Sequence, residues 1–448
     1  MDNATPAAEE HNIVQMRSEL VQYLKNYGLV RSASVEAAFQ AVPRHLFLPG
    51  IDVKRVYSDT AIATKTENGF PISSSSQPAI MACMLEQLDV QPGQHILEIG
   101  TGTGYNAALL AFLVGERGSV TTIDIDEDIV VSARQHLSAA GYPQVRVVHS
   151  DGGLGYAEQA PYDRIILTVG ADDITPAWRQ QLIPGGKLVL PFKITQFRSI
   201  LEFPLALDQV SLALQRIDDH LESYSMYAAG FMPLRGTFAV QQRRSCLLDK
   251  GITFASRKAV PNNTVELLQQ SYQDQEVSIQ TNIYELWGLH IWLILQEPDY
   301  CEIQKKDASQ QYETLPLLGQ QSDGTEASYG LFSQIGLSLL YRQPIDDTEL
   351  EGTEATVNSL GEVIEKKIPR WDLPARLVIR RFGHDNELAQ HLYQTIHAWD
   401  EAGRPFQWNY PMAINNLTIH AYPTDTPYAI GPRELISLRK GSLMVFTW

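Results

Sequence analysis

The segment LEIGTGTGYN, residues 97–106, holds the residues whose types and spacing point most directly to chemistry. An apolar run leads into three alternating glycines, Gly100, Gly102 and Gly104, and a helical pattern follows them. Glycine accepts positive φ and, without a side chain, lets the backbone approach a ligand closely. At the carboxyl end of a strand in a parallel sheet, such a turn borders a ligand crevice. We therefore expect the glycines and the intervening Thr101 to bind a cofactor.

Two features of this turn distinguish between classes of cofactor. The dinucleotide fingerprint is G-x-G-x-x-G, but Tyr105 stands where its last glycine would be. Glu98 precedes the turn, and a carboxylate there disfavours a pyrophosphate but suits a sulfonium cation with an α-amino group. The turn therefore favours S-adenosylmethionine over NAD. A plain tight turn between strand and helix is the simpler alternative.

Two later acids support this choice. Asp124 ends the next apolar strand, 20 residues beyond Gly104, where a carboxylate accepts hydrogen bonds from ribose hydroxyls. Asp151, followed by Gly152, ends the third strand, where an acid can accept from an adenine amino group. Each aspartate alone would be an ordinary turn or helix-cap residue. Together, at successive strand ends after a glycine turn, they predict an adenosine site.

The elements that must position these residues alternate between strand and helix. Residues 91–141 read as turn, strand, glycine turn, helix, strand, acidic turn and helix, and further strands are expected at 145–151, 162–170 and 187–192. Strands this apolar, alternating with helices, indicate a parallel sheet covered on both faces. A last strand pair is expected within residues 199–218. The fold class is therefore α/β.

The length of 448 residues favours two domains. The regular alternation weakens near residue 236, so we expect one domain over residues 1–236 and a second, α+β domain over residues 237–448. Within the second, the polar segment 304–326 is expected to be a loop.

Composition excludes several classes of function. The 52 acidic and 35 basic residues give a formal charge of −17, which argues against nucleic acid as a partner because such binding needs a basic face. The three cysteines are far apart and indicate neither a disulfide framework nor a zinc site. His290, His391 and His397 show no metal-ligand spacing, so no metal is expected. The first residues lack a secretion signal and no apolar run spans a membrane, so we expect a cytoplasmic protein.

The stretch GFPISSSSQPAIM, residues 69–81, contains four consecutive serines. Serine-rich runs are usually linkers, but this one directly precedes a helical pattern that begins near Pro78. A serine there can cap the helix. A hydroxyl can also donate one rotatable hydrogen bond to a substrate. The residues alone leave both roles open.

Five segments together resemble the protein-L-isoaspartate O-methyltransferase family. They are AVPRHLFLPG (41–50), ISSSSQPAI (72–80), ILEIGTGTGYNAALLA (96–111), SDGGLGYAEQAPYDRI (150–165) and LIPGGKLVLPF (182–192). The resemblance covers roughly residues 13–235. It implies a Rossmann-like class I methyltransferase domain that moves a methyl group from S-adenosylmethionine to a peptide carboxylate, normally that of isoaspartate.

The resemblance also suggests catalytic positions. In the family pattern T-I-S-Q-P, the serine before the Q-P pair lies beside the substrate carboxylate and the cofactor, and that position corresponds to Ser76. Ser74 takes the threonine position, and Ser75 replaces the isoleucine. Thr168, which with Gly170 ends the fourth strand, faces the same crevice and contacts substrate or cofactor unless it is a plain turn residue.

The expected reaction needs few protein groups. A carboxylate with a pKa of about 4 is already a nucleophile at neutral pH, and the methyl donor is a cation, so placement and attraction supply most of the catalysis. Neutral hydroxyl donors suffice to orient the carboxylate. His45 is accordingly expected to be a packed structural histidine and not a base.

The lead-in TKTENGFPISSSSQP departs from the usual P-I-G-x-G-Q-T-I-S-Q-P, and the C-terminal addition is long. Both features resemble the branch that esterifies an aspartate in ribosomally synthesised precursor peptides of the lanthipeptide or graspetide type. The ester then collapses to a succinimide (aspartimide), which can hydrolyse to isoaspartate. In this hypothesis residues 237–448 recognise the peptide. The alternatives are a repair methyltransferase acting on damaged isoaspartyl proteins, an idle cofactor-binding scaffold and, opposed by Tyr105, a dinucleotide oxidoreductase.

Overall fold

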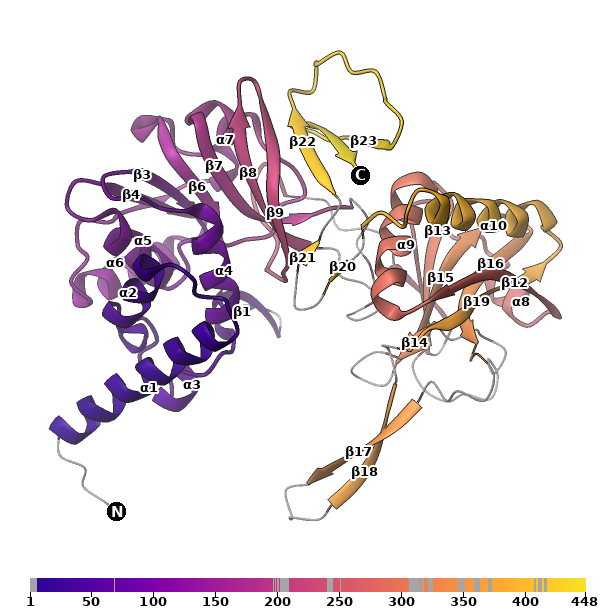
Figure 1. Ribbon diagram of the computed structural model, residues 1–448, viewed down its shortest axis with the longest axis horizontal. Coiled ribbons are helices and arrows are strands. Elements are labelled where there is room, and N and C mark those ends of the chain that lie inside the picture. Colours follow the sequence, from indigo (N-terminus) through magenta and orange to yellow (C-terminus); the bar gives the residue numbers. More distant parts are fainter. Residues whose placement is uncertain are drawn as a thin grey trace.

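The protein folds into two lobes joined by a group of C-terminal strands (Figure 1). The computed structural model describes residues 6–67, 69–195, 197, 199, 201, 209–239, 245–249, 251–305, 315, 318–320, 325–343, 345, 351–357, 363–369, 373–406, 408–409, 413–414 and 417–448. In this described part, no helix has the length and apolar character needed to cross a membrane.

The N-terminal lobe begins with helices and a hairpin that precede the main sheet. They are α1 (Pro6–Asn26), α2 (Ala33–Ala41), η1 (Arg44–Phe47), α3 (Val53–Val56), β1 (Ile62–Glu67), β2 (Phe70–Ser75) and α4 (Pro78–Leu88). Strand β2 pairs antiparallel with β1, so the first serines of the run are extended strand residues. The expected helix at Pro78 is present.

The main sheet follows in the expected order of alternating strands and helices. Its strands here are β3 (His95–Ile99), β4 (Ser119–Asp124), β5 (Arg146–His149), β6 (Tyr162–Leu167), β7 (Leu182–Lys193), β8 (Gln209–Ile217) and β9 (His220–Ala228). The intervening helices are α5 (Tyr105–Val114), α6 (Glu127–Ala139), η2 (Gly152–Leu154), η3 (Ala157–Gln159) and α7 (Pro176–Gln181). In space these strands follow the order β5-β4-β3-β6-β7-β8-β9. Neighbours from β5 through β4, β3 and β6 to β7 are parallel, whereas β8 pairs antiparallel with both β7 and β9.

Side chains of the central strand alternate between two cores. Ile96 packs in one cluster with residues of α4 and α5, such as Leu85 and Leu109, whereas Leu97 packs in another cluster with Trp178 of α7. This alternation follows from the two-residue repeat of a strand. The parallel sheet is therefore covered on both faces, and the α/β expectation is confirmed.

Two local expectations differ from the structure. The sequence PGG at 184–186, which is typical of a turn, lies inside the long strand β7. The sequence TVELLQQSYQ at 264–273, which favours a helix, is helical only as far as Leu268, and strand β12 begins at Tyr272. The expected strand at 199–207 and most of the expected loop at 304–326 fall outside the described residues.

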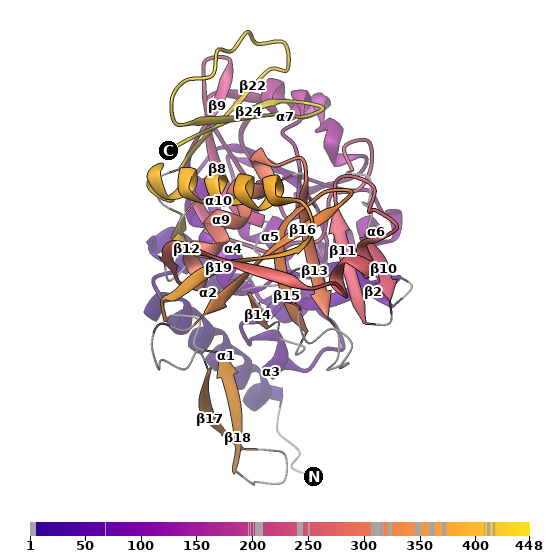
Figure 2. The same ribbon diagram turned by 90° about the vertical axis from the view of Figure 1, so that its right-hand side faces the viewer.

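The C-terminal lobe is an antiparallel sheet with helices, as an α+β domain requires. Its strand order is β10 (Ser245–Asp249), β11 (Ile252–Ser256), β13 (Tyr300–Lys305), β15 (Glu326–Phe332), β16 (Gly336–Gln343), β19 (Ala375–Gly383) and β12 (Tyr272–Thr281), with β14 (Gly319–Gln320) beside β15. The helices are α8 (Thr264–Leu268), α9 (Ile283–Gln296) and α10 (Asn386–Glu401). The hairpin of β17 (Glu351–Val357) and β18 (Val363–Pro369) extends away from this lobe (Figures 1 and 2).

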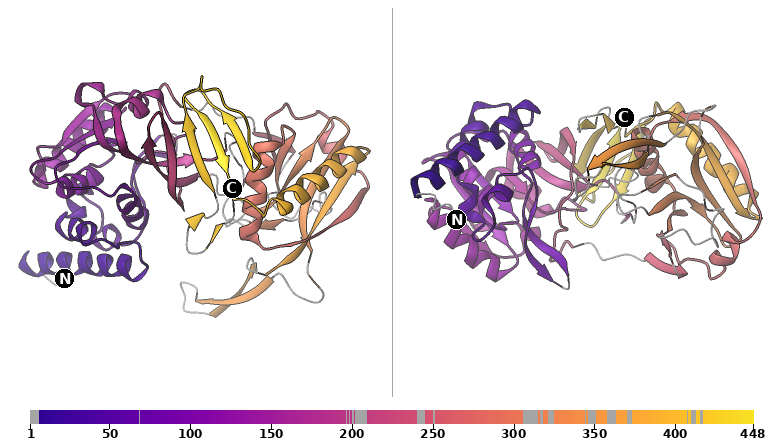
Figure 3. Two further views of the ribbon diagram at one scale, coloured as in Figure 1. Left: turned by 45° about the horizontal axis from the view of Figure 1, so that its top comes forward. Right: turned by 90° about the horizontal axis from the view of Figure 1, so that it is seen from below.

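The last strands of the chain return to the first lobe. Strands β22 (Thr418–Tyr422), β23 (Glu434–Leu438) and β24 (Leu443–Thr447) extend the main sheet in the order β23-β24-β22-β9, and the short β21 (Ala413–Ile414), paired with β20 (Trp408–Asn409), also reaches β9. They lie between the two lobes (Figure 3). The expected division into domains 1–236 and 237–448 therefore does not hold at the end of the chain, where β22 to β24 belong to the main sheet. Strand β22 pairs there with the backbone edge that β9 would otherwise expose.

The two lobes also share apolar packing. One cluster of buried side chains continues from Leu97 and Ile165 of the main sheet to Leu289 and Tyr300 of the C-terminal lobe. Phe197 meets the ring of Tyr300 edge-on, with centroids 5.2 Å apart. The position of the C-terminal lobe is therefore set by a common core as well as by the strands that return from it.

Candidate active site

The glycine turn lies at the carboxyl end of β3 and has the backbone that the sequence predicts. Gly100 and Gly102 have φ values of +101° and +51°, which side chains rarely tolerate. A Cβ at Gly100 would lie 2.5 Å from the Thr168 hydroxyl oxygen, and that hydroxyl donates to the Gly100 carbonyl at 2.6 Å. Thr168 therefore lies at the turn, as expected, and supports its backbone.

Asp124 joins the turn from the end of β4. Its Oδ2 accepts from the Gly102 N–H at 3.1 Å, and its Oδ1 accepts from the Asp126 N–H at 3.2 Å. Burial raises the pKa of the Asp124 carboxyl above its ordinary value, against these two hydrogen bonds. The structure thus brings Asp124 and the glycines together at one edge of the sheet.

Glu98 does not face this edge. Its side chain is 0% exposed, and its two oxygens accept from Asn106 Nδ2 at 2.7 Å and Thr122 Oγ1 at 2.5 Å. Thr101 shares the network, because its hydroxyl lies 2.8 Å from that of Thr122. Side-chain alternation turns Glu98 toward α5, on the same side as Ile96. Glu98 therefore ties α5 to β4 beneath the turn, and its expected contact with the cofactor's cation stays a prediction.

Asp151 lies at the same edge but is engaged by a distant segment. Its Oδ1 accepts from the Gly153 N–H at 2.9 Å and its Oδ2 from the Thr237 N–H at 2.7 Å. A Cβ at Gly236 would lie 2.6 Å from this carboxylate. The chain that leaves the main sheet for the C-terminal lobe therefore crosses the end of β5.

Gly152, which follows Asp151, is closely packed against two side chains. The Gly152 carbonyl accepts from the indole N–H of Trp178 at 2.8 Å, and a Cβ on Gly152 would meet Ile99 at 2.3 Å. Gly152 is thus a close-packing glycine.

The segment that crosses the end of β5 is fixed further by Arg235, whose guanidinium donates to both oxygens of Asp126 at 3.0 and 2.8 Å.

The four serines separate into two pairs. The hydroxyls of Ser73 and Ser75 are engaged, Ser73 accepting from Thr64 at 3.2 Å and Ser75 accepting from Arg44 at 3.3 Å. Those of Ser74 and Ser76 make no hydrogen bond to any residue that the structure describes. The Ser74 carbonyl oxygen lies 3.3 Å from where a Cβ on Gly102 would be. The serine segment therefore rests against the glycine turn.

Arg44, for which the sequence suggested no role, holds this segment. It is fully buried, and its guanidinium donates to the carbonyls of Val56 at 3.0 Å and Ser76 at 2.9 Å as well as to Ser75 Oγ. Burial lowers the pKa of the guanidinium from its ordinary value. An arginine inside the apolar sequence VPRHLF is the signal that could have identified it.

The helix-capping role that the sequence left open for the serines is not observed for α4. The N-cap residue is Gln77, whose side chain makes no capping bond. Asp59 caps the helix instead, accepting from the Ala79 N–H at 2.8 Å and from Gln77 Nε2 at 2.9 Å. His45 is structural, as expected, because its Nδ1 lies 2.9 Å from the Tyr57 hydroxyl.

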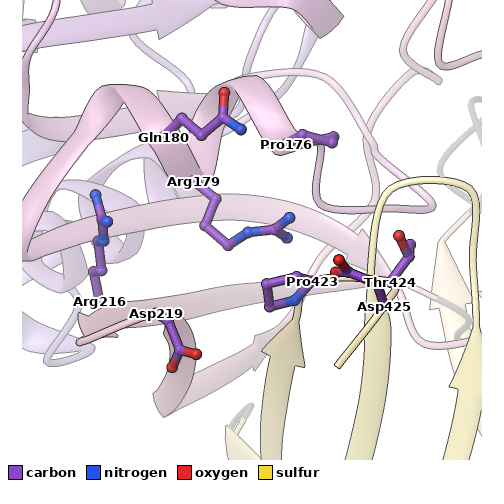
Figure 4. A pocket seen from close by; sticks show the side chains of 8 residues that line it. All are labelled: Pro176, Arg179, Gln180, Arg216, Asp219, Pro423, Thr424 and Asp425. Carbon is purple, nitrogen blue, oxygen red and sulfur yellow. The ribbon is translucent and has the colours of Figure 1, made fainter. Parts of the chain in front are cut away.

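A surface pocket of about 460 Å³ lies elsewhere, where α7 meets the β8–β9 turn and the loop after β22 (Figure 4). Its lining residues are Pro176, Arg179, Gln180, Arg216, Asp219, Pro423, Thr424 and Asp425. None of the sequence-predicted site residues is among them. The chemistry of the glycine turn is therefore separate from this pocket.

Comparison with known proteins identifies the family. The profile described as protein-L-isoaspartate(D-aspartate) O-methyltransferase (PCMT) matches residues 15–209. The enzyme of that name from Methanopyrus kandleri is 42% identical over 176 residues, which cover 39% of this chain and 76% of that protein. That from Methanothermobacter thermautotrophicus is 34% identical over 223 residues, covering 49% and 95%. The chain belongs to the protein-L-isoaspartate O-methyltransferase family.

Solved structures of the same name are similar to this chain. One protein-L-isoaspartate O-methyltransferase has a TM-score of 0.48 at 21% identity and covers 90% of this chain and 96% of that one. A Plasmodium falciparum protein described as a member, in complex with S-adenosyl-L-homocysteine, has a TM-score of 0.40 at 18% identity and covers 48% and 97%.

Membership of this family places the chain among the class I methyltransferases that use S-adenosylmethionine as methyl donor. The turn fits this cofactor: Gly102 has positive φ and its N–H is fixed by Asp124. Gly100, Gly102, Gly104 and Asp124 are the residues that would hold it. Binding roles for these four residues stay predictions, as do those for Thr101, Asp151, Gly152 and Thr168.

The buried Glu98 makes stability depend on pH. Burial raises its pKa to about 7 from an ordinary 4.5. Below about pH 4.5 the Glu98 carboxyl is mostly protonated in both the folded and unfolded states, and its contribution to the stability of the fold is fully present. As the pH rises to about 7 the unfolded chain ionises first, so about 3 kcal/mol of stability is lost. Replacing Glu98 with Gln should remove this loss.

Urea unfolding of the cofactor-free protein at pH 5 and pH 8 measures the effect. The free energy of unfolding of Glu98→Gln minus that of the native protein should be larger at pH 8 than at pH 5. Glu116→Gln, at an exposed acid on the surface, should change both values equally, within about 0.5 kcal/mol. A Glu98→Gln variant that follows the native protein at both pH values would contradict this account.

Proposed function

We propose that this enzyme methylates the side-chain carboxylate of isoaspartyl residues in proteins or peptides. The family relatives carry this activity in their names. The structural observation that supports it most is the position of the serine segment against the glycine turn, with the Ser74 and Ser76 hydroxyls uncommitted. A donor-lined surface then adjoins the proposed cofactor site.

The chemistry needs orientation more than proton transfer. Bound S-adenosylmethionine supplies a methyl group activated by its sulfonium charge. The acceptor carboxylate, with a pKa of about 4, is ionised at neutral pH, so no residue has to remove a proton. A hydroxyl from Ser76, with Ser74 beside it, donates a neutral hydrogen bond that directs one carboxylate oxygen. Ser75, whose hydroxyl accepts from Arg44, is a positioning residue in this proposal.

We propose as second candidate an aspartate in a ribosomal precursor peptide. The observation in its favour is the C-terminal lobe, which lies beyond the family match at residues 15–209 and beyond the 39% and 49% of this chain that the two sequence relatives compared above cover. In this case the methyl ester would be attacked by the next residue's backbone nitrogen. Methanol leaves and a succinimide forms, which water can open to isoaspartate. The C-terminal lobe would then recognise the peptide.

A substrate comparison separates the two candidates. The full chain is incubated with methyl-labelled S-adenosylmethionine and three peptides: an isoaspartyl peptide, the same sequence with ordinary aspartate, and a precursor peptide encoded beside this chain. The proposal expects label in the isoaspartyl peptide and none in its aspartyl twin. Label in the precursor alone would favour the second candidate. Label in none of the three would contradict both.

Ser76→Ala tests the assigned hydroxyl. Turnover should fall by about 100-fold, because a misplaced acceptor loses its alignment with the methyl group, while cofactor affinity measured by calorimetry stays within about twofold of the native value. Ser73→Ala is the matched control, since the Ser73 hydroxyl is engaged by Thr64. Loss of cofactor binding together with turnover would mean that Ser76 is structural.

Arg44→Gln tests the support beneath the serines. The shorter side chain leaves the carbonyls of Val56 and Ser76 unpaired, which costs about 1–3 kcal/mol of stability. Turnover should drop with little change in cofactor affinity, because the hydrogen bonds of Arg44 go to the serine segment and to residues 56–60, and its contact near the turn is with the Tyr105 ring, 5.8 Å away. The control is Arg55→Gln on the exposed side of α3. Full turnover in a folded Arg44→Gln protein would exclude this role.

A further inference from the structure

Three side chains outside the methyl-transfer site lie together where the C-terminal strands join the main sheet. His220 and Glu222 are two residues apart on β9 and so share one face of the sheet. His420 on β22 is paired directly opposite Glu222. The antiparallel register therefore brings two imidazoles and one carboxylate onto one face from strands nearly 200 residues apart.

The distances in this cluster are those of groups that converge without bonding to one another. Glu222 Oε2 lies 3.9 Å from His220 Nε2 and 3.6 Å from His420 Nδ1. All three atoms lie within 4.8 Å of one another. Both separations exceed hydrogen-bond length, and His420 Nδ1 is buried without a hydrogen-bond partner among the residues described. A ring nitrogen with a lone pair or proton and no partner is an unmet bonding position.

We propose that His220, Glu222 and His420 bind a divalent metal ion of the zinc class. Two imidazole nitrogens and one carboxylate oxygen are ligands that zinc accepts, with water in the fourth position. Bonds of about 2.1 Å in a tetrahedral site separate the ligand atoms by about 3.4 Å. The two separations from Glu222, 3.6 and 3.9 Å, are slightly longer, and the two imidazoles offer nitrogens within 4.8 Å of each other, so side-chain rotations are needed to close the site.

The surroundings favour this geometry. Tyr422 stacks on the His220 ring, with centroids 4.8 Å apart and planes 16° apart, which limits rotation of that imidazole. Asp219 Oδ1 lies 3.7 Å from the other nitrogen of His220, on the side where a carboxylate orients a ligating histidine. The Glu222 side chain is 47% exposed, so an ion and its water can enter from solvent.

Such an ion would link β9 to β22 and so fasten the end of the chain to the methyltransferase sheet. Because a ligand that binds only the folded state stabilises it, zinc should raise the melting temperature. The sequence predicted no metal because the third ligand is remote from the H-x-E pair, and no local spacing reveals it.

The test uses the full chain, stripped with a chelator and titrated with zinc chloride in a calorimeter. The native protein should bind one ion per chain and melt at a higher temperature with zinc. Glu222→Gln and His420→Gln should each weaken zinc binding by about 100-fold or more, since even outer-shell partners contribute about 10- to 100-fold. His391→Gln is the matched control, because His391 also pairs with a glutamate, Glu297, but the described residues place no third ligand beside that pair.

Each other outcome overturns the proposal. Absence of zinc binding by the native chain, equal binding by Glu222→Gln and His420→Gln, or the same loss in His391→Gln would show that these residues hold no metal. Circular dichroism verifies that each variant is folded. If His420→Gln fails to fold, Glu222→Gln decides alone, since its half-exposed side chain is replaced by one of equal size.

Discussion

The close approach of two backbones, at Gly102 and Ser74, is the constraint on which the candidate active site depends. The Ser74 carbonyl would be only 3.3 Å from a Cβ on Gly102, so any side chain there would press the serine segment away from the glycine turn. The meeting also requires the segment to be held, and Arg44 supplies this by bonding to both Ser75 and Ser76. One buried cation thus positions the uncommitted hydroxyls next to the turn that we propose binds the cofactor.

The glycine turn is supported from beneath by Glu98, whose burial lowers the stability of the fold when it is ionised. Glu98 joins Asn106 of α5 to Thr122 of β4 from beneath, and burying an ionised carboxylate without a cation is unfavourable. The raised pKa of Glu98 is the expression of that cost. A network that is fully hydrogen-bonded gives rigidity in return, and a methyl-transfer site that works through placement needs a rigid turn.

The C-terminal lobe is attached to the methyltransferase sheet at both of its ends. The chain leaves after β9, crosses the carboxyl edge of the sheet where Arg235 meets Asp126 and Thr237 meets Asp151, and returns as β22 beside β9. The lobe is therefore an insertion between two neighbouring strands of one sheet. Its first connection touches the edge where the cofactor is expected, so the position of the lobe and the shape of that edge are physically linked.

Local features were determined by the sequence alone. The alternation of strands and helices, the positive φ of the glycine turn, the place of Asp124 and the helix at Pro78 depend on neighbouring residues, and each was predicted correctly. What only the tertiary structure decided concerns residues that are far apart in the chain. The cap of α4 came from Asp59 and not from a serine, Glu98 turned toward α5, and Asp151 met Thr237. The pairing of β22 with β9, and with it the cluster of His220, Glu222 and His420, follows from an exposed strand edge that any distant strand could cover. Periodicity and spacing report short-range geometry, whereas the choice of partner across some 200 residues depends on the packing of the whole chain.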